Sequence, residues 1–366
     1  MKYYFFVNPV AGQGKHFSEM TEKIRSAMEE LNIHRDHYAV YKTEAVGDGE
    51  TKASLLAEKL VSDGLISRMD NFPGEDEALS QGDFGEGEHT HARHSRVCAA
   101  RFYACGGDGT ANEIINGVMG FDGVSVGIIP IGTGNDTVRN FPEAGDFLDI
   151  KAQILGSEKP IDVMEYSGLI DGKEKVGYCV NMFNIGFDCN VVEMARELKK
   201  KPLISGPAAY FLSIFGKFIE KEGVNLRIEE VGGPEGPELL EEGKVLLCAI
   251  SNGSFCGGGI KSAPQSIVDD GYFDVNIVKD VSRAKFLKFL PAYKNGTHLN
   301  KAGVEEILDV RKSKEIVVSP GPESLEETGG TFNLCVDGEV FSTTGITIRI
   351  REKALRFVLP AKMRNL

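Results

Sequence analysis

Three glycine-rich loops, each directly after a short apolar run, constrain the fold of this chain more than any other feature. They are "VNPVAGQGK" (residues 7–15), "GGDGTANE" (106–113) and "PIGTGNDTVRN" (130–140). Segments with helical spacing of apolar residues separate the strand-like runs, and this alternation is typical of parallel strands joined by crossover helices. In an open parallel sheet, loops at the carboxyl ends of strands share one edge, where ligands bind. The sequence therefore predicts an N-terminal α/β domain with a parallel sheet and one nucleotide-sized cleft, which Thr43 joins from the end of the second strand.

The middle loop combines the residues of a tight turn with polar side chains. Its glycines let the backbone approach a ligand closely, and a helix that begins there presents unpaired N–H groups and a partial positive charge. Asp108 lies at the centre of this turn, with the hydroxyl of Thr110 and the amide of Asn112 beside it. This mixture suits phosphate together with Mg²⁺ better than phosphate alone. The alternative is a tight strand-to-helix turn that binds nothing.

Other familiar motifs are absent or misplaced. The chain has no G-x-x-x-x-G-K-[ST] and no G-x-G-x-x-G, so the Walker A, dinucleotide and protein-kinase fingerprints are missing. "GVSVG" (123–127) matches the nucleophile elbow G-x-S-x-G, but Ser125 lies inside an apolar strand-like run and no helix follows at once, which argues against a hydrolase. A formal net charge of −13 argues against binding to nucleic acid.

The character of the sequence changes at about Ser157. Short strand-like runs follow, among them "KVGYCVNMFNIG" and "FNLCVDGEV", with Gly, Pro and Asp turns between them, which predicts a mostly antiparallel β-sandwich. The final "ALRFVLPAK" reads as a strand that returns to the first domain. We therefore expect a nucleotide-binding domain of residues 1–156 plus a returning tail of about 352–366, and a β-sandwich domain of residues 157–351.

Residues 70–96 interrupt the first domain. They contain seven acids, four glycines and three histidines without an apolar period, so we expect a flexible surface insertion rather than a metal site at His89, His91 and His94. Seven scattered cysteines without C-x-x-C spacing indicate reduced thiols. The first apolar run is too short for a secretory signal, and no run approaches the length of a membrane span. These features predict a cytoplasmic protein.

The three loops, in this order and spacing, resemble those of the diacylglycerol kinase catalytic family, which includes bacterial lipid kinases and the sphingosine and ceramide kinases. The resemblance continues through "GGGIKSAPQSIVDDGYFDVNIV" (257–278) and "VDGE" (336–339). It covers nearly the whole chain except residues 70–96 and the expected loop at 229–243. It implies an α/β nucleotide domain and a β-sandwich that carries the lipid substrate, with the active site between the two.

The resemblance also implies roles for individual residues. Asp108 and Asp136 would hold the catalytic Mg²⁺ through water, and Asp337 would act as general base on the lipid hydroxyl, with Glu339 close by. Asp-Gly is also a common hairpin dipeptide, so a plain turn at Asp337 is the alternative. The residues expected to line the ATP site are Asn8, Pro9, Val10, Ala11, Gly12, Thr43, Gly106, Gly107, Asp108, Gly109, Thr110, Ala111, Asn112, Glu113, Gly132, Thr133, Gly134 and Asn135.

A second magnesium site is implied in "SIVDDGYFDV". There, Asp270 would bind a structural Mg²⁺ through its carboxylate, and Ile267 and Tyr272 through their backbone carbonyls. The alternative is a turn that opens a strand. Whether this metal is bound stays open at this point, because not every family member is expected to keep it.

The expected activity is ATP- and Mg²⁺-dependent phosphorylation of a lipid hydroxyl, with diacylglycerol as the leading substrate, in phospholipid biosynthesis. A basic cluster, Arg196, Lys199, Lys200 and Lys201, precedes an apolar helix-like run and is a candidate for docking on the inner face of a membrane. A helix packed on the sandwich, with solvated lysines, is an equal alternative. A sphingoid-base or other lipid-alcohol kinase, an NAD kinase, and a catalytically silent nucleotide- or lipid-binding regulator remain as alternatives, and a homodimer is left open.

Overall fold

The computed structural model describes residues 1–12, 16–69, 97–187, 189, 194, 223–231, 236–324 and 328–363. These residues form two compact units, Met1–Val163 with Arg351–Leu366 (unit 1) and Met164–Ile350 (unit 2). The boundary expected at residue 157 is the first residue of β7 (Ser157–Ile170), whereas the units divide inside this strand. A second strand, β16 (Glu339–Leu359), also has residues in both units.

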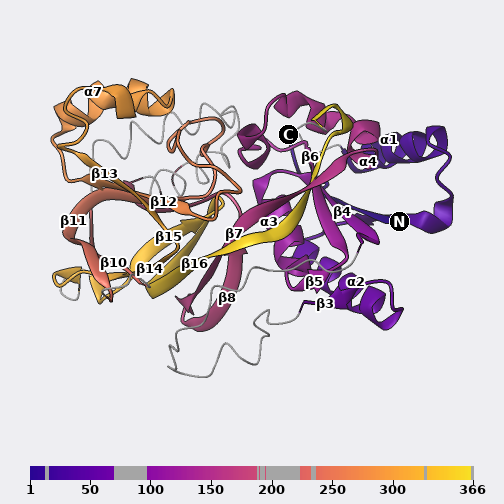
Figure 1. Cartoon of the computed structure of the whole chain (residues 1–366), viewed down its shortest axis with the longest axis horizontal. Helices are drawn as coiled ribbons and strands as arrows, with labels where there is room; N and C mark the ends of the chain where they lie inside the picture. The colour runs from indigo at the N-terminus through magenta and orange to yellow at the C-terminus, as the bar shows by residue number, and fades with distance from the viewer. Residues whose placement is uncertain are drawn as a thin grey trace. The chain divides into compact units, whose positions relative to one another are not determined.

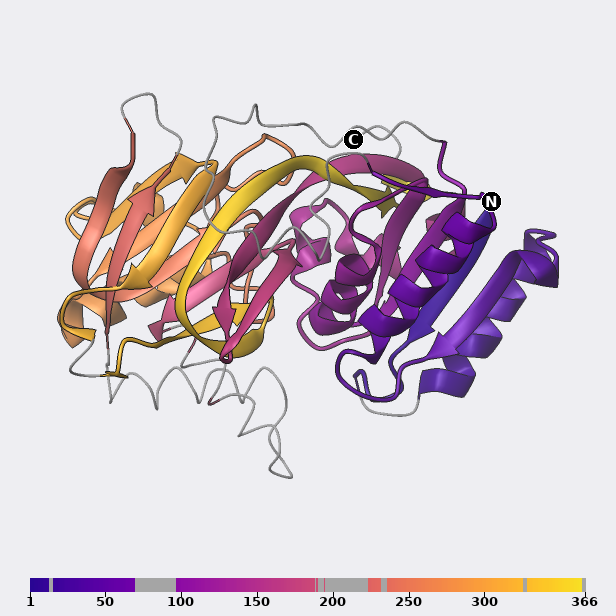
Figure 2. The same cartoon turned by 90° about the horizontal axis from the view of Figure 1, so that it is seen from below.

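Unit 1 is an α/β layer structure. Its elements are β1 (Lys2–Val7), α1 (His16–Glu30), β2 (Tyr38–Lys42), α2 (Asp48–Ser62), β3 (Ser67–Arg68), β4 (Ala100–Gly106), α3 (Asp108–Val118), β5 (Phe121–Asp122), β6 (Val124–Pro130) and α4 (Ile150–Ile154). Strands β2, β1, β4 and β6 pair in parallel in that order. The end of β16 adds a further parallel strand, with Phe357 opposite Val126. Figures 1 and 2 show helices packed over these strands.

Unit 1 has two apolar layers, one on each face of its sheet, because successive side chains of a strand point to opposite faces. Phe5 and Tyr103 stack with ring centroids 4.8 Å apart, on the face that α1 and α4 cover. Phe6 and Phe102 stack at 5.8 Å and belong to the opposite face, because neighbouring residues of a strand alternate. Ser125 is fully buried within β6, 3.2 Å from the Cys98 sulfur, which agrees with the exclusion of a nucleophile elbow.

Unit 2 is built from antiparallel strands. Its elements are β8 (Lys173–Cys179), β9 (Met182–Gly186), β10 (Val224–Glu230), β11 (Glu238–Ser251), β12 (Phe273–Lys279), α7 (Arg283–Lys294), β13 (Leu308–Ser313), β14 (Glu315–Pro320) and β15 (Phe332–Val336), together with parts of β7 and β16. Its strand pairs are antiparallel throughout the described residues. Residues 229–243, expected as a hairpin tip or loop, include the ends of the paired strands β10 and β11, which extend further into this segment than expected, through residues 229–230 and 238–243.

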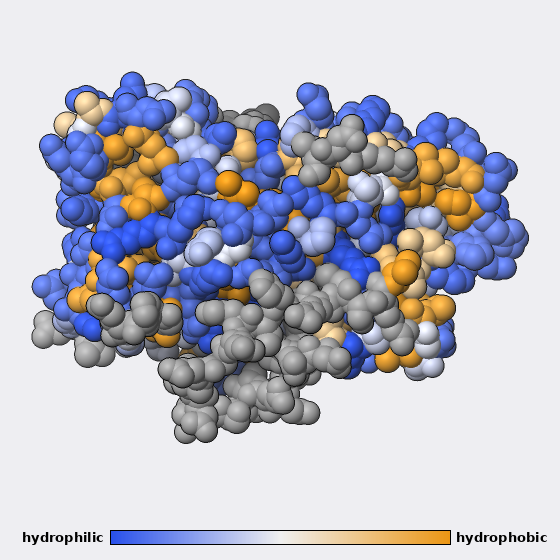
Figure 3. Space-filling model, in the orientation of Figure 1, coloured by the Kyte–Doolittle hydropathy of each residue, from blue (hydrophilic) through white to orange (hydrophobic). Residues whose placement is uncertain are grey.

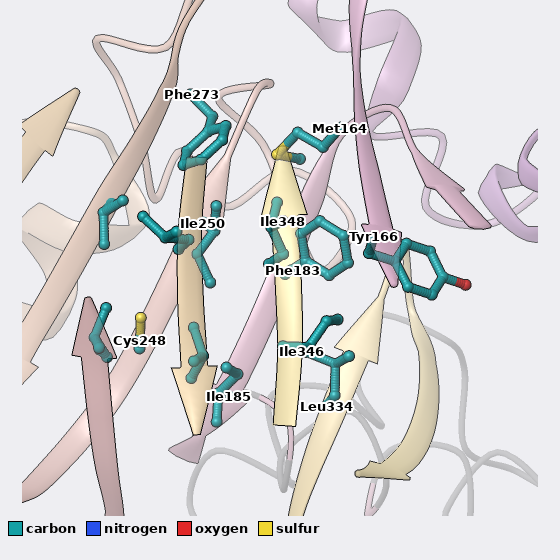
Figure 4. Close-up of a cluster of buried hydrophobic side chains, with 14 of the residues drawn as sticks. Met164, Tyr166, Phe183, Ile185, Cys248, Ile250, Phe273, Leu334, Ile346 and Ile348 are labelled. Atoms are coloured by element: carbon teal, nitrogen blue, oxygen red, sulfur yellow. The ribbon is translucent and has the colours of Figure 1, made fainter. Parts of the chain in front are cut away.

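Alternate residues of these strands form the main core of unit 2. Phe183 and Ile185 of β9, Ile250 of β11 and Ile346 and Ile348 of β16 are fully or nearly fully buried. Figure 4 shows such side chains from different strands gathered in one space. On the face of the molecule in Figure 3, hydrophilic residues surround smaller groups of hydrophobic ones. The seven cysteines are buried and form no disulfide. Within the described part of the chain, no helix is both long and apolar enough to cross a membrane.

Candidate active site

Asn8 connects the first glycine loop to the second. Its backbone N–H donates to Cys105 O at 3.0 Å, and its side-chain amide donates to the Thr110 hydroxyl at 3.1 Å. Its side-chain oxygen accepts the N–H of Val10 at 3.0 Å, which closes the loop on itself. Val10 is 76% exposed and Ala11 is buried, so the loop presents an apolar side chain to the outside.

The second and third loops are in direct backbone contact. Gly132 N donates to Gly106 O at 3.0 Å, and a Cβ on Gly132 would lie only 2.3 Å from the Cα of Gly107. Real Cβ atoms do not approach this closely, so position 132 requires glycine. Asn135 has a positive φ of 56° and donates its side-chain amide to Pro130 O and Gly132 O at 3.1 and 2.9 Å. Asparagine tolerates this backbone region and here fastens the third loop.

The carboxylates of Asp108 and Asp136 both lie near Gly134. A Cβ at Gly134 would be 2.9 Å from Oδ2 of Asp108 and 3.6 Å from Oδ2 of Asp136. The other oxygen of Asp108 accepts the N–H and the hydroxyl of Thr137, the first residue of η2 (Thr137–Asn140). Asp136 is 6% exposed and has Arg139 Nε 3.6 Å from its Oδ1. The structure thus brings the two expected magnesium carboxylates together on neighbouring loops.

Glu113 holds the beginning of α2. Its carboxylate accepts the N–H of Gly47 at 2.8 Å and that of Gly49 at 2.9 Å. Gly47 is the N-cap of α2, has a φ of 82° and offers no side chain for capping. A residue of α3 therefore supplies the cap that the local sequence lacks. Thr43, expected at the same edge, is buried, with its N–H on Val7 O at 3.1 Å.

The remaining ATP-site candidates belong to the same loops. Pro9 and Gly12 lie on the first loop, where Gly12 has a φ of 64°, and Thr133 is exposed on the third. Gly109, Ala111 and Asn112 form the first turns of α3. Asn112 accepts from the Asn116 amide on its side-chain and backbone oxygens at 3.2 and 2.9 Å. Together with the Asn8–Thr110 and Gly132–Gly106 contacts, this places all three glycine loops in one hydrogen-bonded group within unit 1.

Asp337 forms the turn between β15 and β16 in unit 2. It has a φ of 45° and is followed by Gly338 with a φ of 91°, as a two-residue hairpin turn requires. Its carboxylate accepts four hydrogen bonds, all from the turn between β8 and β9. The donors are the N–H groups of Val180, Asn181 and Met182 at 3.0, 3.1 and 3.0 Å and the Cys179 thiol at 3.2 Å.

The turn that holds Asp337 is itself fixed. Asn252 and Gly253 donate their backbone N–H groups to Asn181 O at 3.0 and 2.9 Å, and the Asn252 amide donates to Val180 O at 2.9 Å. Burial, and then the Asp337 charge, raise the pKa of the Cys179 thiol well above its usual range. Cys179 is therefore a neutral donor to the carboxylate. Glu339 opens β16, half-buried and opposite Val336.

Among the expected structural magnesium ligands, the Asp270 carboxylate has other partners. Oδ1 of Asp270 accepts the N–H of Tyr272 at 3.1 Å, and Oδ2 forms an ion pair with the ammonium of Lys312. The ammonium groups of Lys312 and Lys314 lie 6.0 and 4.9 Å from the centre of the Tyr272 ring. No group of three or more His, Cys, Asp or Glu side chains arranged for a metal occurs among the described residues, either at Asp270 or at Asp108 and Asp136. These surroundings do not fit a divalent cation at Asp270.

Two expectations fall on residues outside the described ranges. They are the basic cluster of Arg196, Lys199, Lys200 and Lys201 with the following apolar run, and the insertion at residues 70–96. Conversely, Thr137 and residues 179–182 were not among the residues expected at the site. Thr137 directly follows Asp136 in the third loop, which is a usable signal. Residues 179–182 lie more than 150 positions from Asp337 and carry no such signal.

Comparisons with known proteins agree with this architecture. Residues 76–166 match the model of the diacylglycerol kinase catalytic domain, and residues 181–359 match that of the YegS C-terminal NAD kinase beta sandwich-like domain. A protein named as a YegS-like lipid kinase in Alcanivorax borkumensis is 30% identical over 265 residues, which cover 70% of this chain and 78% of that protein. A diacylglycerol kinase of Bacillus subtilis is 29% identical over 261 residues, 69% and 78% of the two chains.

A solved structure supports the fold. The crystal structure of a diacylglycerol kinase from Bacillus anthracis superimposes with a TM-score of 0.59 at 17% identity, over 99% of this chain and 97% of that one. At this identity the likeness concerns the fold alone. The family follows from the two domain models and from the relatives in sequence. This chain belongs to the family of bacterial lipid kinases of the diacylglycerol kinase type, which includes YegS-like members.

Proposed function

We propose that this chain transfers the γ-phosphate of ATP to the hydroxyl of a lipid alcohol, with Mg²⁺ as cofactor. Diacylglycerol is the leading acceptor, which would give phosphatidic acid, a precursor in phospholipid biosynthesis. The observation that carries the proposal is the pair of carboxylates, Asp108 and Asp136, which both lie near Gly134. The names of the relatives in sequence support a lipid as the acceptor.

The donor set around Gly134 fits a magnesium nucleotide. Mg²⁺ prefers carboxylate oxygens and water, and it is commonly held by one or two carboxylates together with substrate phosphates. Two carboxylates side by side repel each other, and a divalent cation between them relieves this repulsion. When bound, the cation would neutralise charge on the phosphates during transfer.

Residues of this chain supply the rest of the nucleotide site. The N-terminus of α3 begins at Asp108, so its first backbone N–H groups and the partial positive charge of the helix are suited to phosphate. The glycines at 106, 107 and 132 allow the two loops to lie backbone against backbone. Asn8 ties the first loop to Thr110 and so keeps the three loops in one arrangement. Positioning of this kind provides most of the catalysis in phosphoryl transfer.

We assign Asp337 to the acceptor hydroxyl. Four donors hold its carboxylate in a single orientation, which suits it to accept a hydrogen bond from a substrate O–H. Because phosphoryl transfer passes through a loose transition state, the hydroxyl proton needs to move only late in the reaction. Asp337 then acts first by orienting the hydroxyl and second by receiving its proton. Glu339, two residues further on, is the candidate for a supporting role.

The alternatives differ in the acceptor or in the chemistry. A sphingoid-base kinase or an NAD kinase would use the same nucleotide loops with another hydroxyl. A silent nucleotide- or lipid-binding regulator would need none of the three carboxylates, and the retention of Asp108, Asp136 and Asp337 favours an enzyme. We also propose that the lipid is presented at a membrane surface, because diacylglycerol does not leave the bilayer readily.

The test is transfer of label from γ-labelled ATP with Mg²⁺ to lipids in mixed micelles. The panel contains diacylglycerol, monoacylglycerol, sphingosine, ceramide and a polyprenol, with NAD in a parallel reaction. Labelled phosphatidic acid that disappears in Asp108→Asn and Asp337→Asn supports the proposal. Label in sphingosine or NAD moves the assignment to that acceptor. Bound ATP without any labelled product, at every lipid in the panel, would contradict a diacylglycerol kinase activity.

A further inference from the structure

An ion pair attaches residues 261–272, the segment that leads into β12, to strand β13. Asp270 and Lys312 come from this segment and from β13, and their side chains are 23% and 42% exposed. Lys312 lies opposite Asp274 in the register of β12 and β13, so its stem is fixed by the strand while its ammonium reaches the Asp270 carboxylate. The N–H of Tyr272 occupies the other oxygen of Asp270. Both oxygens of the carboxylate therefore have a donor.

A second ammonium adds to the positive charge at this place. Lys314 Nζ lies 4.9 Å from the centre of the Tyr272 ring, which Lys312 also approaches. The Tyr272 ring thus has two cations near it, an arrangement that its π-electrons favour. A divalent cation brought to Asp270 would be repelled by both ammonium groups.

Asp274, the acidic residue opposite Lys312 in the strand register, does not offset this repulsion of a divalent cation. Asp274 is 2% exposed, and its two oxygens accept from the Gln265 amide at 3.3 Å and from the Ser266 hydroxyl at 2.7 Å. These bonds tie the segment to β12 without any metal. Ser266 also donates to Ser251 O at 3.3 Å, which extends the attachment to β11.

We propose that Lys312 takes the place of the divalent cation that the family resemblance implies at Asp270. The ammonium supplies the positive charge that neutralises the carboxylate and fastens residues 261–272 to the edge of β13. The described part of residues 261–272 then needs no divalent cation to hold it against β13. The inference concerns cation binding alone and stands whether or not the proposed reaction is correct.

The experiment measures Mn²⁺ bound per chain from the loss of the free-ion electron paramagnetic resonance signal. The full-length chain carries Asp108→Asn and Asp136→Asn, so that the carboxylates of unit 1 do not contribute. Four variants are compared in this background: Lys312→Met, Lys312→Gln, Asp270→Asn, and the double variant Lys312→Met with Asp270→Asn. Lys314→Met is the matched control, because it removes a neighbouring ammonium and leaves the ion pair in place. Circular dichroism checks that each variant is folded.

The expected result is that the background chain binds no Mn²⁺ that depends on Asp270. Lys312→Met and Lys312→Gln should each gain about one Mn²⁺ per chain, with an affinity at least about 10-fold above that of the background, since removing one nearby ammonium lowers the repulsion by that order. The added Asp270→Asn change should abolish this gain. A background chain that already binds one Mn²⁺, and loses it with Asp270→Asn, would overturn the inference. So would a failure of both Lys312 variants to bind Mn²⁺, or an equal gain in Lys314→Met.

Discussion

Thr137 donates two hydrogen bonds to one oxygen of Asp108, from its backbone N–H at 3.0 Å and from its hydroxyl at 3.1 Å. This pair fixes the rotation of the Asp108 carboxylate, whose second oxygen lies beside Gly134. The contact joins the beginning of α3 to the third glycine loop. Both residues are thus needed for the arrangement in which Asp108 and Asp136 lie near each other.

Thr137→Val should weaken the use of Mg²⁺ without unfolding the protein. The substitution removes the hydroxyl and keeps the backbone bond, so a loss of about 0.5–1.5 kcal/mol is expected, or about 2–10-fold in kcat/KM. The measurement is the rate of lipid phosphorylation as a function of Mg²⁺ concentration. Thr21→Val, which removes a hydroxyl bonded to Phe17 O on α1, is the control. An unchanged Mg²⁺ dependence in Thr137→Val would contradict the role given to this contact.

Gly134→Ala should impair catalysis strongly, although it adds only one methyl group. The new Cβ would lie 2.9 Å from Oδ2 of Asp108, so this carboxylate or the loop must shift, whereas its 3.6 Å distance from Oδ2 of Asp136 is an ordinary contact. A displacement of this kind costs on the order of 100-fold in kcat/KM. Gly145→Ala is the matched control, because nothing lies within 4 Å of a Cβ at that position. Equal activity of the two variants would show that the space beside Gly134 is not used.

Glu113→Gln should destabilise the fold rather than weaken the binding of ATP. The carboxylate accepts two N–H groups at the start of α2, and the glutamine amide would turn a donor toward one of them. The expected cost is about 1–3 kcal/mol in the free energy of unfolding, measured with urea. Glu58→Gln, in an ion pair with Arg68 on the surface, should change stability by less than about 1 kcal/mol. Normal stability with a raised KM for ATP would instead make Glu113 a nucleotide contact.

The glycine loops were predictable because their chemistry is local. Gly106, Asp108 and Asp136 follow strand-like runs directly, and parallel strands bring such loops to one edge. The contact between Glu113 and Gly47 was not predictable, since it joins residues 66 positions apart and depends on how α2 and α3 pack. In the same way, a spacing of glycines shows that a loop approaches something closely. It does not show that Gly132 approaches the backbone of Gly107.

In unit 2, long-range contacts decide what the sequence left open. "KVGYCVNMFNIG" reads as one strand, but the structure divides it into β8 and β9, because the N–H groups of Val180 and Asn181 bind Asp337 instead of a neighbouring strand. Helix α7 was missed among the strand signals. Its one local signal is Ser282, whose hydroxyl caps the N–H of Lys285 at 3.3 Å, while Pro291 inside the helix works against a helical prediction.

Asp337→Asn should abolish most of the activity, and Cys179→Ala should not. The asparagine lacks the charge that orients and receives the hydroxyl proton, so a loss of about 100–10,000-fold in kcat is expected. Cys179→Ala removes one of four donors and leaves the three backbone bonds, so a decrease of less than about 10-fold is expected. The measurement is kcat and KM for diacylglycerol in mixed micelles. Similar losses in both variants would mean that the hydrogen bonds around the Asp337 carboxylate, rather than its charge, account for the loss of activity.

His298 should make the stability of the chain depend on pH. Its ring is 2% exposed beside Tyr293, at a centroid distance of 5.2 Å, and neither ring nitrogen has a hydrogen-bond partner among the described residues. Burial lowers the pKa of His298 below its ordinary value, and the nearby Ala292 carbonyl, which makes no hydrogen bond of good geometry to the ring, offsets only part of this effect. Below about pH 6.5 the unfolded chain binds a proton that the folded chain does not bind. Stability is therefore lost as the pH falls from about 6.5 toward the lowered pKa of the folded state.

The test compares urea unfolding of the native chain and of His298→Phe between pH 5 and 8. Below pH 6.5, the native chain should lose unfolding free energy relative to His298→Phe by up to about 1.4 kcal/mol per pH unit. Above pH 7.5, the difference in unfolding free energy between the two proteins should be constant. Phenylalanine keeps the ring beside Tyr293, so the packing is largely preserved. His37→Phe, at an exposed histidine, is the control and should leave the pH profile as it is. If His298→Phe retains the full loss of stability at low pH, other groups are responsible, and His298 remains a neutral part of the packing between α7 and the strands.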